Sequence, residues 1–416
     1  MYLNSKNQRR SDGQKDLHRF RLRQEKIMET FAIYFPSWHP DAHYEKWYGK
    51  GFSEWELVKT TKPLYEGHDQ PKTPLWGYFD ESKPEWMEKQ IDLAADHGIS
   101  GFLFDWYWYK GEKFLEKALE EGFLKSRNKT RLKFSLMWAN HTWGKWPATS
   151  NARGMGGCEL GRQVTGDMEL LRQTHSLEDM SDVAEYCCEH YFKEANYWKI
   201  DNSPVFSIYD VNLLISQFGS VEAATDALEV FRKTVKEHGF KDVFLLANIG
   251  CCDDNLYCCG WNRVGRAAAM GFKAVFAYNI VRTPEYSSIP DAMPVYDYSG
   301  VKESHKYCWG KIEAGGLEHF PSVTIGLDVS PRWNRSIRPP MDFKAYSYEP
   351  VVIGNTPEKF GQLVGTAIRQ VSSNNSSNKV IILNAWNEWT EGMFLLPEKR
   401  YGNGYLEALN KSLKKQ

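Results

Sequence analysis

Short apolar runs alternate with segments of helical apolar spacing along most of the chain, and this alternation is its clearest structural signal. The eight apolar runs cover residues 31–34, 101–104, 133–137, 205–208, 243–247, 274–277, 323–327 and 380–383. Short runs that are apolar throughout indicate strands buried on both faces. Such strands alternating with helices are typical of a parallel sheet built from βα units.

The segments between the runs predict the helices. Apolar positions recur at helical spacing over 84–97, 112–125, 177–197, 221–238, 301–314 and 357–373, in a short helix ending near 270 and in a last helix from about 404. Eight strand–helix units predict a (β/α)8 TIM barrel with long βα loops, which occupies residues 29–416 as one catalytic domain. The alternative is an open doubly wound sheet. When that sheet binds nucleotides it normally carries a glycine-rich first βα turn, and none follows Tyr34.

Residues 1–28 are polar and basic and show no apolar period, so they predict a disordered or loosely helical N-terminal extension. Met28 is an alternative start. The extension lacks the apolar core of a secretory signal, and no apolar run approaches the roughly 18 residues of a membrane span. We therefore expect a cytoplasmic protein. The 416-residue chain has a formal net charge of −1, which argues against nucleic acid or an anionic membrane as its main partner.

Polar side chains follow most of the apolar runs. Active sites of parallel barrels lie at the carboxyl ends of the strands. These side chains are therefore expected to share one site, although any strand must also end somewhere polar. The residues in question are Asp105, Asn140, Asp210, Asn248, Asn279, Asp328 and Glu388.

The last apolar run leads directly into the motif WNEWTEG at 386–392, which places Glu388 and Glu391 three residues apart beside two tryptophans. A buried Glu costs several kcal/mol unless it is paired or neutralised. Two close carboxyls favour one ionised and one protonated group, which is what cleavage of a glycosidic bond needs. The Cα atoms would lie about 10 Å apart in an extended chain and about 5 Å apart in a helical turn, so retaining and inverting geometries both stay open. A solvated surface turn is the alternative interpretation.

Aromatic residues are in excess, with 16 Trp, 22 Tyr and 22 Phe. Their flat apolar faces suit sugar rings, although large barrels also bury many aromatics. The first βα loop, 36–83, is too long for a simple connection and contains His39, Trp47, Glu54 and Trp55. Aromatic residues also follow the second run at 106–109, and Trp143 follows the third. This placement favours a carbohydrate site with a functional loop or lid.

The eight cysteines include adjacent pairs at 187–188, 251–252 and 258–259, and no CxxC motif occurs. Free thiols in a reducing compartment are the expected state. The pairs between 251 and 259 are an alternative zinc site. Their spacing argues against it, because structural zinc ligands are usually separated by two to four residues.

Several segments together make the chain similar to the WbsX-type family of glycan-processing proteins, also called glycoside-hydrolase-family-99-like domains. The similarity to the endo-α-mannosidases of glycoside hydrolase family 99 is more distant. The segments are YFP at 34–36 with His39 and Pro40, GKGFSEW at 49–55, KPLYEGH at 62–68, WAN at 138–140, the WNEWTEG motif and YGNGYLE at 401–407. They run from Phe31 to about Leu409, and their combination is more specific than any one of them.

The resemblance implies a (β/α)8 barrel that acts on an oligo- or polysaccharide without a metal or other cofactor. It implies Glu388 as the base that activates the sugar 2-hydroxyl and Glu391 as the acid that protonates the leaving oxygen. That mechanism retains configuration through an epoxide-like intermediate. With the strand ends and aromatic loops, it gives the candidate substrate-binding residues His39, Trp47, Glu54, Trp55, Asp105, Tyr107, Trp108, Asn140, Trp143, Tyr209, Asn248, Asp328, Arg332, Trp386, Asn387 and Trp389.

Some positions depart from the family pattern. The acidic residue that usually follows the strand-three Asn is His141 here. The family segment Trp-Asp-Asn-Thr-Pro-Arg reads LDVSPR at 327–332 and keeps Asp328 and Arg332. These departures bear on the substrate more than on the chemistry.

The sequence therefore predicts a retaining, endo-acting glycoside hydrolase directed at a mannan or heteroglycan. The alternative is a glycosyltransferase of lipopolysaccharide O-antigen or capsular polysaccharide assembly, the activity for which the family is named. Nucleotide-sugar transferases commonly use a DxD metal motif or a phosphate-binding turn. The chain has no DxD, but transfer from a lipid-linked donor needs neither feature. A binding module with an inactive site is a third reading, against which the intact Glu pair argues.

Overall fold

The structure is a computed structural model that describes residues 28–144, 169–250, 262–281, 287–288, 294–332, 351–374 and 376–415. Apart from Met28, the predicted N-terminal extension lies outside these ranges. The cysteine pairs at 251–252 and 258–259, which form the alternative zinc site, also lie outside them.

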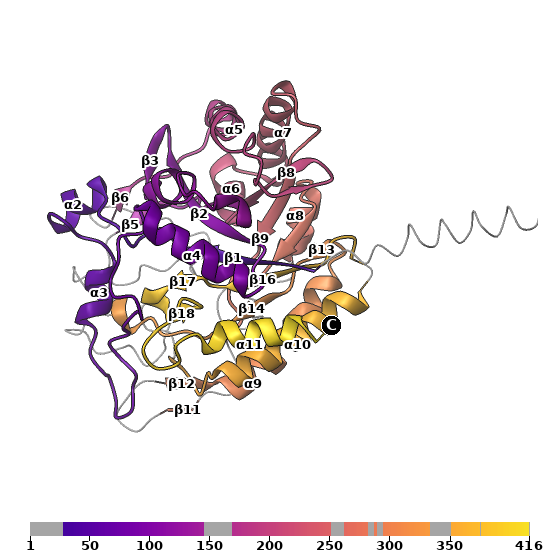
Figure 1. Ribbon diagram of the computed structural model, residues 1–416. Coiled ribbons are helices and arrows are strands. Elements are labelled where there is room, and N and C mark those ends of the chain that lie inside the picture. The colour runs from indigo at the N-terminus through magenta and orange to yellow at the C-terminus, as the bar shows by residue number, and fades with distance from the viewer. Residues whose placement is uncertain are drawn as a thin grey trace, which may run out of the picture.

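A curled parallel sheet forms the centre of the protein (Figure 1). Within the described residues, its hydrogen-bonded path runs in the order β13-β10-β9-β8-β4-β2-β1-β16-β14, and each pairing along this path is parallel. The first strand lies beside the last long one, as in a (β/α)8 barrel. The strands are β1 (Glu29–Tyr34), β2 (Gly101–Tyr109), β4 (Lys133–Trp138), β8 (Ser203–Ile208), β9 (Phe244–Asn248), β10 (Ala274–Phe276), β13 (Glu318–His319), β14 (Ser322–Thr324) and β16 (Val380–Asn384).

Both faces of this sheet are buried, which explains the continuous apolar runs. Successive residues of a strand point to opposite faces. In β1, Phe31 and Ile33 join one hydrophobic cluster, whereas Ala32 joins the other. Trp198 packs in the first cluster, with its ring centroid 3.8 Å from that of Phe31. Gly101 pairs with Phe31, and a Cβ at that position would lie only 2.5 Å from the Phe31 ring.

Helices surround the sheet (Figure 1). Helix α10 packs on β14 and β16, and α9 packs on β12 and β13. Helices α2 and α3 of the first βα loop lie at the same end of the molecule as β17 and β18 (Figure 1). The helices are α2 (Ala42–Tyr48), α3 (Trp55–Thr60), α4 (Pro84–Asp96), α5 (Leu177–His190), α6 (Val211–Phe218), α7 (Val221–Glu237), α8 (Asn262–Ala269), α9 (Tyr298–Glu313), α10 (Pro357–Ser373) and α11 (Gly404–Leu413).

Short strands lie in the connections between these units. Strand β3 pairs with β2, β7 with β8, β5 with β6 and β17 with β18, all antiparallel. Strand β12 pairs with β11 and with β15. Their bounds are β3 (Glu112–Phe114), β5 (Trp143–Gly144), β6 (Glu169–Leu171), β7 (Lys199–Ile200), β11 (Ser287–Ser288), β12 (Pro294–Asp297), β15 (Val351–Ile353), β17 (Asn387–Glu388) and β18 (Met393–Phe394).

The predicted helix over 112–125 is wrong at its start, where residues 112–114 form a strand. Strand β2 continues to Tyr109 and turns back into β3 through Lys110 and Gly111, whose φ values of 51° and 88° fit a tight hairpin turn. A π-helix, Ala118–Phe123, follows. Asp105 therefore lies inside β2 and does not follow it, because the hairpin lengthens the strand beyond its apolar run.

Two further elements differ from the sequence expectation. Helix α6 was not predicted. It begins after Asp210, whose carboxylate accepts hydrogen bonds from the backbone N–H groups of Asn212 and Leu213. Helix α5 ends at His190 and does not reach residue 197.

The seventh strand is divided into two pieces. Strands β13 and β14 flank Phe320 and Pro321, and they pair with β10 and β16 respectively. The N–H of Phe320 donates to the carbonyl of Val275 (2.9 Å), and the N–H of Ile382 donates to the carbonyl of Pro321 (3.0 Å). Proline has no N–H to donate to a ladder. The two ends of the strand path, β13 and β14, therefore belong to one segment, 318–324, and the sheet is barrel-like.

Candidate active site

Glu388 and Glu391 are both buried, with 2% and 6% of their surface exposed. Strand β16 leads into the hairpin of β17 and β18, and a single 3-10 turn, Trp389–Glu391, lies inside that hairpin. The turn ends at Gly392 with φ +68°, and a Cβ there would lie 2.7 Å from the Cβ of Asp328. Only glycine fits this left-handed position. The motif therefore folds back on itself and keeps both carboxyls inside the protein.

The guanidinium of Arg332 lies among three carboxylates. Its Nη1 donates to Oε1 of Glu391 (2.6 Å), its Nη2 donates to Oε2 of Glu54 (3.3 Å), and Nη2 lies 3.7 Å from Oε2 of Glu388. Arg332 ends a short 3-10 helix after β14 and is buried. One buried cation thus holds three buried carboxyls in one place.

Glu54 joins this cluster from the first βα loop, at the start of α3. Its carboxylate accepts hydrogen bonds from the hydroxyls of Thr390 (2.6 Å) and Tyr44 (3.2 Å). It is fully buried. The first loop therefore supplies a structural member of the site, and it is fastened to the motif after the eighth strand.

The protonation of the cluster follows from burial and from Arg332. Burial raises the pKa of Glu388 to about 8, although the charge of Arg332 partly offsets this effect. Burial also raises the pKa of Glu391, again with an offset from Arg332. Burial disfavours the charge on Arg332 itself, but the carboxylates of Glu54, Glu391 and Glu388 outweigh it and raise its pKa. At neutral pH this arrangement favours a proton on one carboxyl of the pair beside an ionised neighbour.

Two further polar groups face the pair. The hydroxyl of Tyr278, which follows β10, donates to Oε1 of Glu388 (3.4 Å). Oδ1 of Asp105 is buried and has no hydrogen-bond partner among the residues that the structure describes. Burial, followed by the charges of Glu388 and Glu391, raises the pKa of Asp105 well above its ordinary value. Burial and the two neighbouring carboxyls therefore both favour the protonated form of Asp105.

Asp328 and Asn387 hold the motif in place. Oδ2 of Asp328 accepts hydrogen bonds from His68 (2.9 Å) and Gln70 (2.7 Å), and its backbone N–H donates to the carbonyl of Glu391 (2.6 Å). Burial alone would raise the pKa of Asp328, but the hydrogen bond and charge of His68 outweigh it and lower the pKa to about 2. The side-chain amide of Asn387 exchanges two hydrogen bonds with the backbone of residue 35, at 2.7 and 2.8 Å.

Replacing Asp328 should therefore weaken the fold in a pH-dependent way. We expect Asp328→Asn to lower the free energy of unfolding at pH 7 by about 2 kcal/mol, because each unit of pKa shift is worth about 1.4 kcal/mol. A lowered native pKa gives stability that is complete above about pH 4 and is lost as the pH falls toward 2. Urea unfolding curves of variant and wild type should therefore converge in acid. Asp226→Asn, at an exposed position of α7, is the control. A gap that stays constant at every pH contradicts this account.

Three predicted tryptophans lie inside the protein, around the motif. Trp55, Trp386 and Trp389 are buried. The indole N–H of Trp55 donates to the carbonyl of Phe79 (2.7 Å), and that of Trp386 donates to Gln90 (2.8 Å). The rings of Trp55 and Trp389 lie 5.6 Å apart. Through these contacts the three tryptophans support the Glu388 motif from within the core.

Other aromatic candidates gather near the ends of β2, β4 and β8. Tyr107 and Trp143 are buried with their ring centroids 5.3 Å apart. Trp108 is buried and packs 4.7 Å from Tyr186. Tyr209 is half-buried and lies 5.6 Å from Tyr278, the residue that contacts Glu388. Trp47, on α2, is also half-buried.

The remaining polar candidates bond to neighbouring protein groups. Nδ1 of His39 lies 3.3 Å from Oε1 of Glu81. The side-chain amide of Asn140 exchanges hydrogen bonds with the backbone of Asp210 (2.8 and 2.9 Å), and Oδ1 of Asn248 accepts from the N–H of residue 250 (2.8 Å). Asn140 and Asn248 thus bind backbone groups at the carboxyl ends of β4 and β9.

Sequence reasoning did not select Tyr44, Thr390, Tyr278, His68 or Gln70 as site residues. Thr390 lies inside the motif and Tyr278 directly follows an apolar run, so both could have been selected from their positions in the sequence. His68 and Gln70 act through Asp328, 260 and 258 residues away, and Tyr44 acts through Glu54, itself recognised only as part of the first loop. In the described parts of the chain, no group of three or more His, Cys, Asp or Glu side chains is arranged to hold a metal ion.

The chain thus combines a barrel-like parallel sheet with two buried carboxyls that follow its last long strand. The chain belongs to the family described as glycosyltransferase WbsX, whose family model matches residues 30–409. It is 27% identical over 393 residues to the uncharacterized protein WxcX of Xanthomonas campestris pv. campestris (strain B100), covering 92% of this chain and 49% of that protein. The chain therefore spans about half the length of the curated relatives it matches.

Solved structures share the fold at low sequence identity. A glycoside hydrolase-like protein superposes with a TM-score of 0.61 at 12% identity, covering 94% of each chain. The GH99 endo-alpha-mannosidase from Bacteroides thetaiotaomicron superposes with a TM-score of 0.52 at 13% identity, covering 93% of this chain and 97% of that one. The resemblance inferred from the sequence is thereby confirmed at the level of family and fold. Among the described helices, none is long and apolar enough to cross a membrane.

Proposed function

We propose that this chain is a retaining, endo-acting glycoside hydrolase whose reaction is carried by Glu388 and Glu391. The observation that carries the proposal is the pair of buried carboxyls held beside one buried guanidinium. Glycosidic cleavage needs one carboxyl to give a proton and another to accept one or to attack. Burial and Arg332 supply that difference between two chemically identical side chains.

In the mechanism implied by the resemblance, the carboxylate of Glu388 removes the proton of the sugar 2-hydroxyl. The 2-oxygen attacks C1 and forms an epoxide-like ring while the glycosidic C–O bond breaks, and Glu391 gives its proton to the leaving oxygen. Water then opens the ring at C1. Glu391 takes a proton from that water, and Glu388 returns its proton to the 2-oxygen. The product keeps the configuration of the substrate, and both carboxyls recover their initial states.

The geometry around Arg332 favours the opposite assignment of the proton. Arg332 lies 2.6 Å from Glu391 but 3.7 Å from Glu388, and the pKa of Glu388 is raised to about 8. With an activated aryl glycoside, the leaving group needs no protonation. A variant lacking the acid should then recover activity selectively, and one lacking the base should not. Comparing Glu388→Gln with Glu391→Gln on such a substrate therefore assigns the two roles.

The reaction itself is tested by incubating the purified protein with an oligosaccharide array and identifying the released products. Cleavage inside a glycan, with the anomeric configuration of the new end retained in early NMR spectra, supports the proposal. Glycan cleavage with inversion would contradict the retaining mechanism, and intact glycans throughout the array would contradict hydrolysis.

Transfer to a sugar acceptor is the second candidate, and it is favoured by the description of the family as glycosyltransferases. The same carboxyl pair can serve it if a sugar hydroxyl, in place of water, attacks the intermediate. Adding a large excess of acceptor oligosaccharide separates the two reactions. A hydrolase yields mainly free reducing ends, whereas a transferase yields a longer saccharide and leaves the donor intact when no acceptor is present.

Tyr209, a half-buried aromatic residue beside Tyr278, should contact the sugar. Tyr209 reaches Glu388 through Tyr278, so we expect Tyr209→Ala to weaken glycan binding by roughly 1 kcal/mol, or about fivefold in Kd. The measurement is calorimetry with an oligosaccharide that the array identifies, in a Glu388→Gln background that prevents cleavage. Tyr307→Ala, at a position that is 54% exposed, is the matched control. Equal Kd values for both variants would remove Tyr209 from the binding site.

We also propose that residues 29–416 form one catalytic domain and that segment 318–324 completes its barrel. The hydrogen bonds of Phe320 and Ile382 on either side of Pro321 support this closure. Amide exchange at Phe320 and Ile382 should then be as slow as in the interior of β1 and β2. Rapid exchange at both amides would indicate an open edge.

A further inference from the structure

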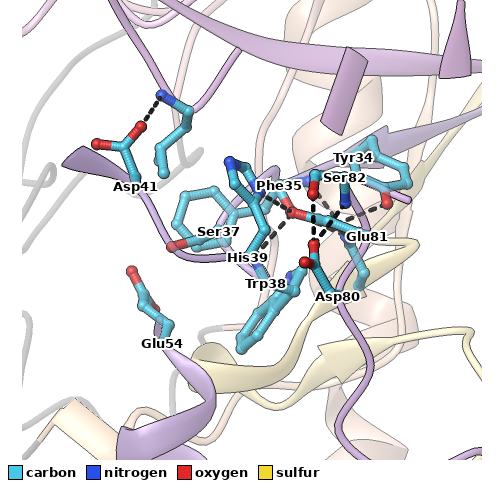
Figure 2. A network of polar contacts seen from close by, with 12 residues as sticks. Tyr34, Phe35, Ser37, Trp38, His39, Asp41, Glu54, Asp80, Glu81 and Ser82 are labelled. Carbon is cyan, nitrogen blue, oxygen red and sulfur yellow. Dashed lines mark hydrogen bonds and ion pairs between the residues drawn. The ribbon is translucent and has the colours of Figure 1, made fainter. Parts of the chain in front are cut away.

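The carboxylate of Glu81 is fully buried just before α4, and hydrogen-bond donors converge on it (Figure 2). The hydroxyl of Tyr34 donates to Oε2 (2.7 Å), the backbone N–H of Trp38 donates to Oε1 (2.8 Å), and Nδ2 of Asn387 donates to Oε2 (3.4 Å). Nδ1 of His39 lies 3.3 Å from Oε1. A backbone N–H and an amide NH2 can only donate, so this environment fits a carboxylate that accepts from all sides.

These partners come from three separate parts of the chain: the end of β1, the segment that follows it, and the hairpin that carries Glu388. We propose that Glu81 is a positioning residue of the active site, which fixes residues 34–39 against the Glu388 motif. The inference rests on the function proposed above. Neither a motif nor the end of an apolar run marks Glu81 in the sequence, so it was not among the predicted site residues.

The segment that Glu81 fixes also contacts the carboxyl cluster. The guanidinium of Arg332 lies over the ring of Phe35, 5.7 Å from its centroid. The backbone N–H of Glu54 donates to the carbonyl of Ser37 (3.2 Å). The hydroxyl of Ser37 is 2.7 Å from that of Tyr44, which donates in turn to Glu54 (3.2 Å). Arg332 and Glu54 therefore both rest on the segment that Glu81 holds.

The chemical consequence follows from Arg332. Its charge favours the ionised forms of Glu388 and Glu391, while Glu54 disfavours them, so the distances within this group set the titration of the pair. Tyr278 and Asp105 complete the groups that face Glu388. Loss of the Glu81 carboxylate should shift Arg332 and Glu54 and change that titration. A purely structural residue would lower stability and leave the titration of the folded fraction unchanged.

The test compares Glu81→Gln with Glu85→Gln, which alters an exposed carboxyl in the first turn of α4. Two NMR readouts need no substrate. The first is the 15N spectrum of ring-labelled histidine, in which His39, assigned by its loss in His39→Gln, should be the Nδ1–H tautomer in wild type and control. The second is the 13C carboxyl titration of Glu388. In Glu81→Gln the tautomer signal should change, and the midpoint should move by about half a pH unit or more.

Kinetics on an identified glycan supply a third readout. Glu81→Gln should lower kcat about tenfold, shift the pH–rate profile in step with the Glu388 titration, and change KM little. A folded Glu81→Gln protein with wild-type tautomer, titration and kcat overturns the proposal. If that variant does not fold, Tyr34→Phe removes one donor and should shift the titration in the same direction by less; no shift there also overturns it. A wild-type chain that cleaves no glycan would refute the proposed function, while the NMR readouts would still decide the role of Glu81.

Discussion

Glycan turnover by Glu388→Gln and by Glu391→Gln is expected to fall about a hundred- to ten-thousandfold, the usual contribution of a positioned acid or base. The melting temperature should stay the same or rise. Both carboxyls are buried with raised pKa values, so an isosteric neutral amide resembles the protonated form that burial favours. Glutamine also preserves the volume and one acceptor oxygen.

Initial rates on an array-identified glycan, together with calorimetric melting of the same samples, measure both effects. Glu407→Gln changes an exposed carboxyl on α11 and should leave both quantities at wild-type values. A large fall in melting temperature for either pair variant would show that the carboxyl is structural. Full activity in one of them would reduce the catalytic pair to a single residue.

The largest loss of stability is expected for Arg332→Met. It leaves Glu54, Glu388 and Glu391 buried without their shared cation, and removing one partner of a buried ion pair typically costs about 3–5 kcal/mol. Without the guanidinium, the native pKa values of Glu388 and Glu391 rise further. Raised carboxyl pKa values mean that stability is complete below the unfolded pKa and is lost as the pH rises toward the native one. The deficit should therefore be small near pH 4 and largest above neutrality.

Urea unfolding at several pH values between about 4 and 8 measures that deficit directly. Arg127→Met is the matched control, because Arg127 forms an ion pair with Glu88 at the surface, with 88% of its side chain exposed. Exposed pairs contribute about 0–1 kcal/mol, so its deficit should be small at every pH. A deficit for Arg332→Met that does not grow with pH would mean that the carboxyls do not depend on this cation.

Much of the fold could be predicted from local pattern alone, because burial on both faces leaves an unbroken apolar run. The runs at 31–34 and 380–383 became β1 and β16, and helices α4 and α10 begin where their prolines predict. The pattern failed where tertiary context decided the outcome. The two-residue turn after Tyr109 converted the start of a predicted helix into a hairpin, and Pro321 divided the seventh strand.

The candidate site was only partly predictable for a similar reason. Glu388 and Glu391 are close in sequence, so their relationship could be inferred from one motif. Arg332 and Glu54 are 278 residues apart, and nothing in the local pattern links them; Glu54 was noted in the long first loop, whereas only the family resemblance selected Arg332. Glu81 lies in no motif and the family resemblance did not select it, and its contact with Asn387 spans 306 residues. Side chains that are brought together only by the folding of the sheet cannot be recognised from the spacing of residues along the sequence.

The pairing of β1 with β16 has a consequence for the order in which this protein is made and folds. Ribosomes release the chain from its amino end, so Glu54 and its loop emerge long before the carboxyls that share Arg332 with them. Glu54 can therefore become buried beside its cation only after residues 332 and 388–391 have been made and have docked. Products that end before residue 388 lack both carboxyls of the pair, so the proposed reaction requires the last strand.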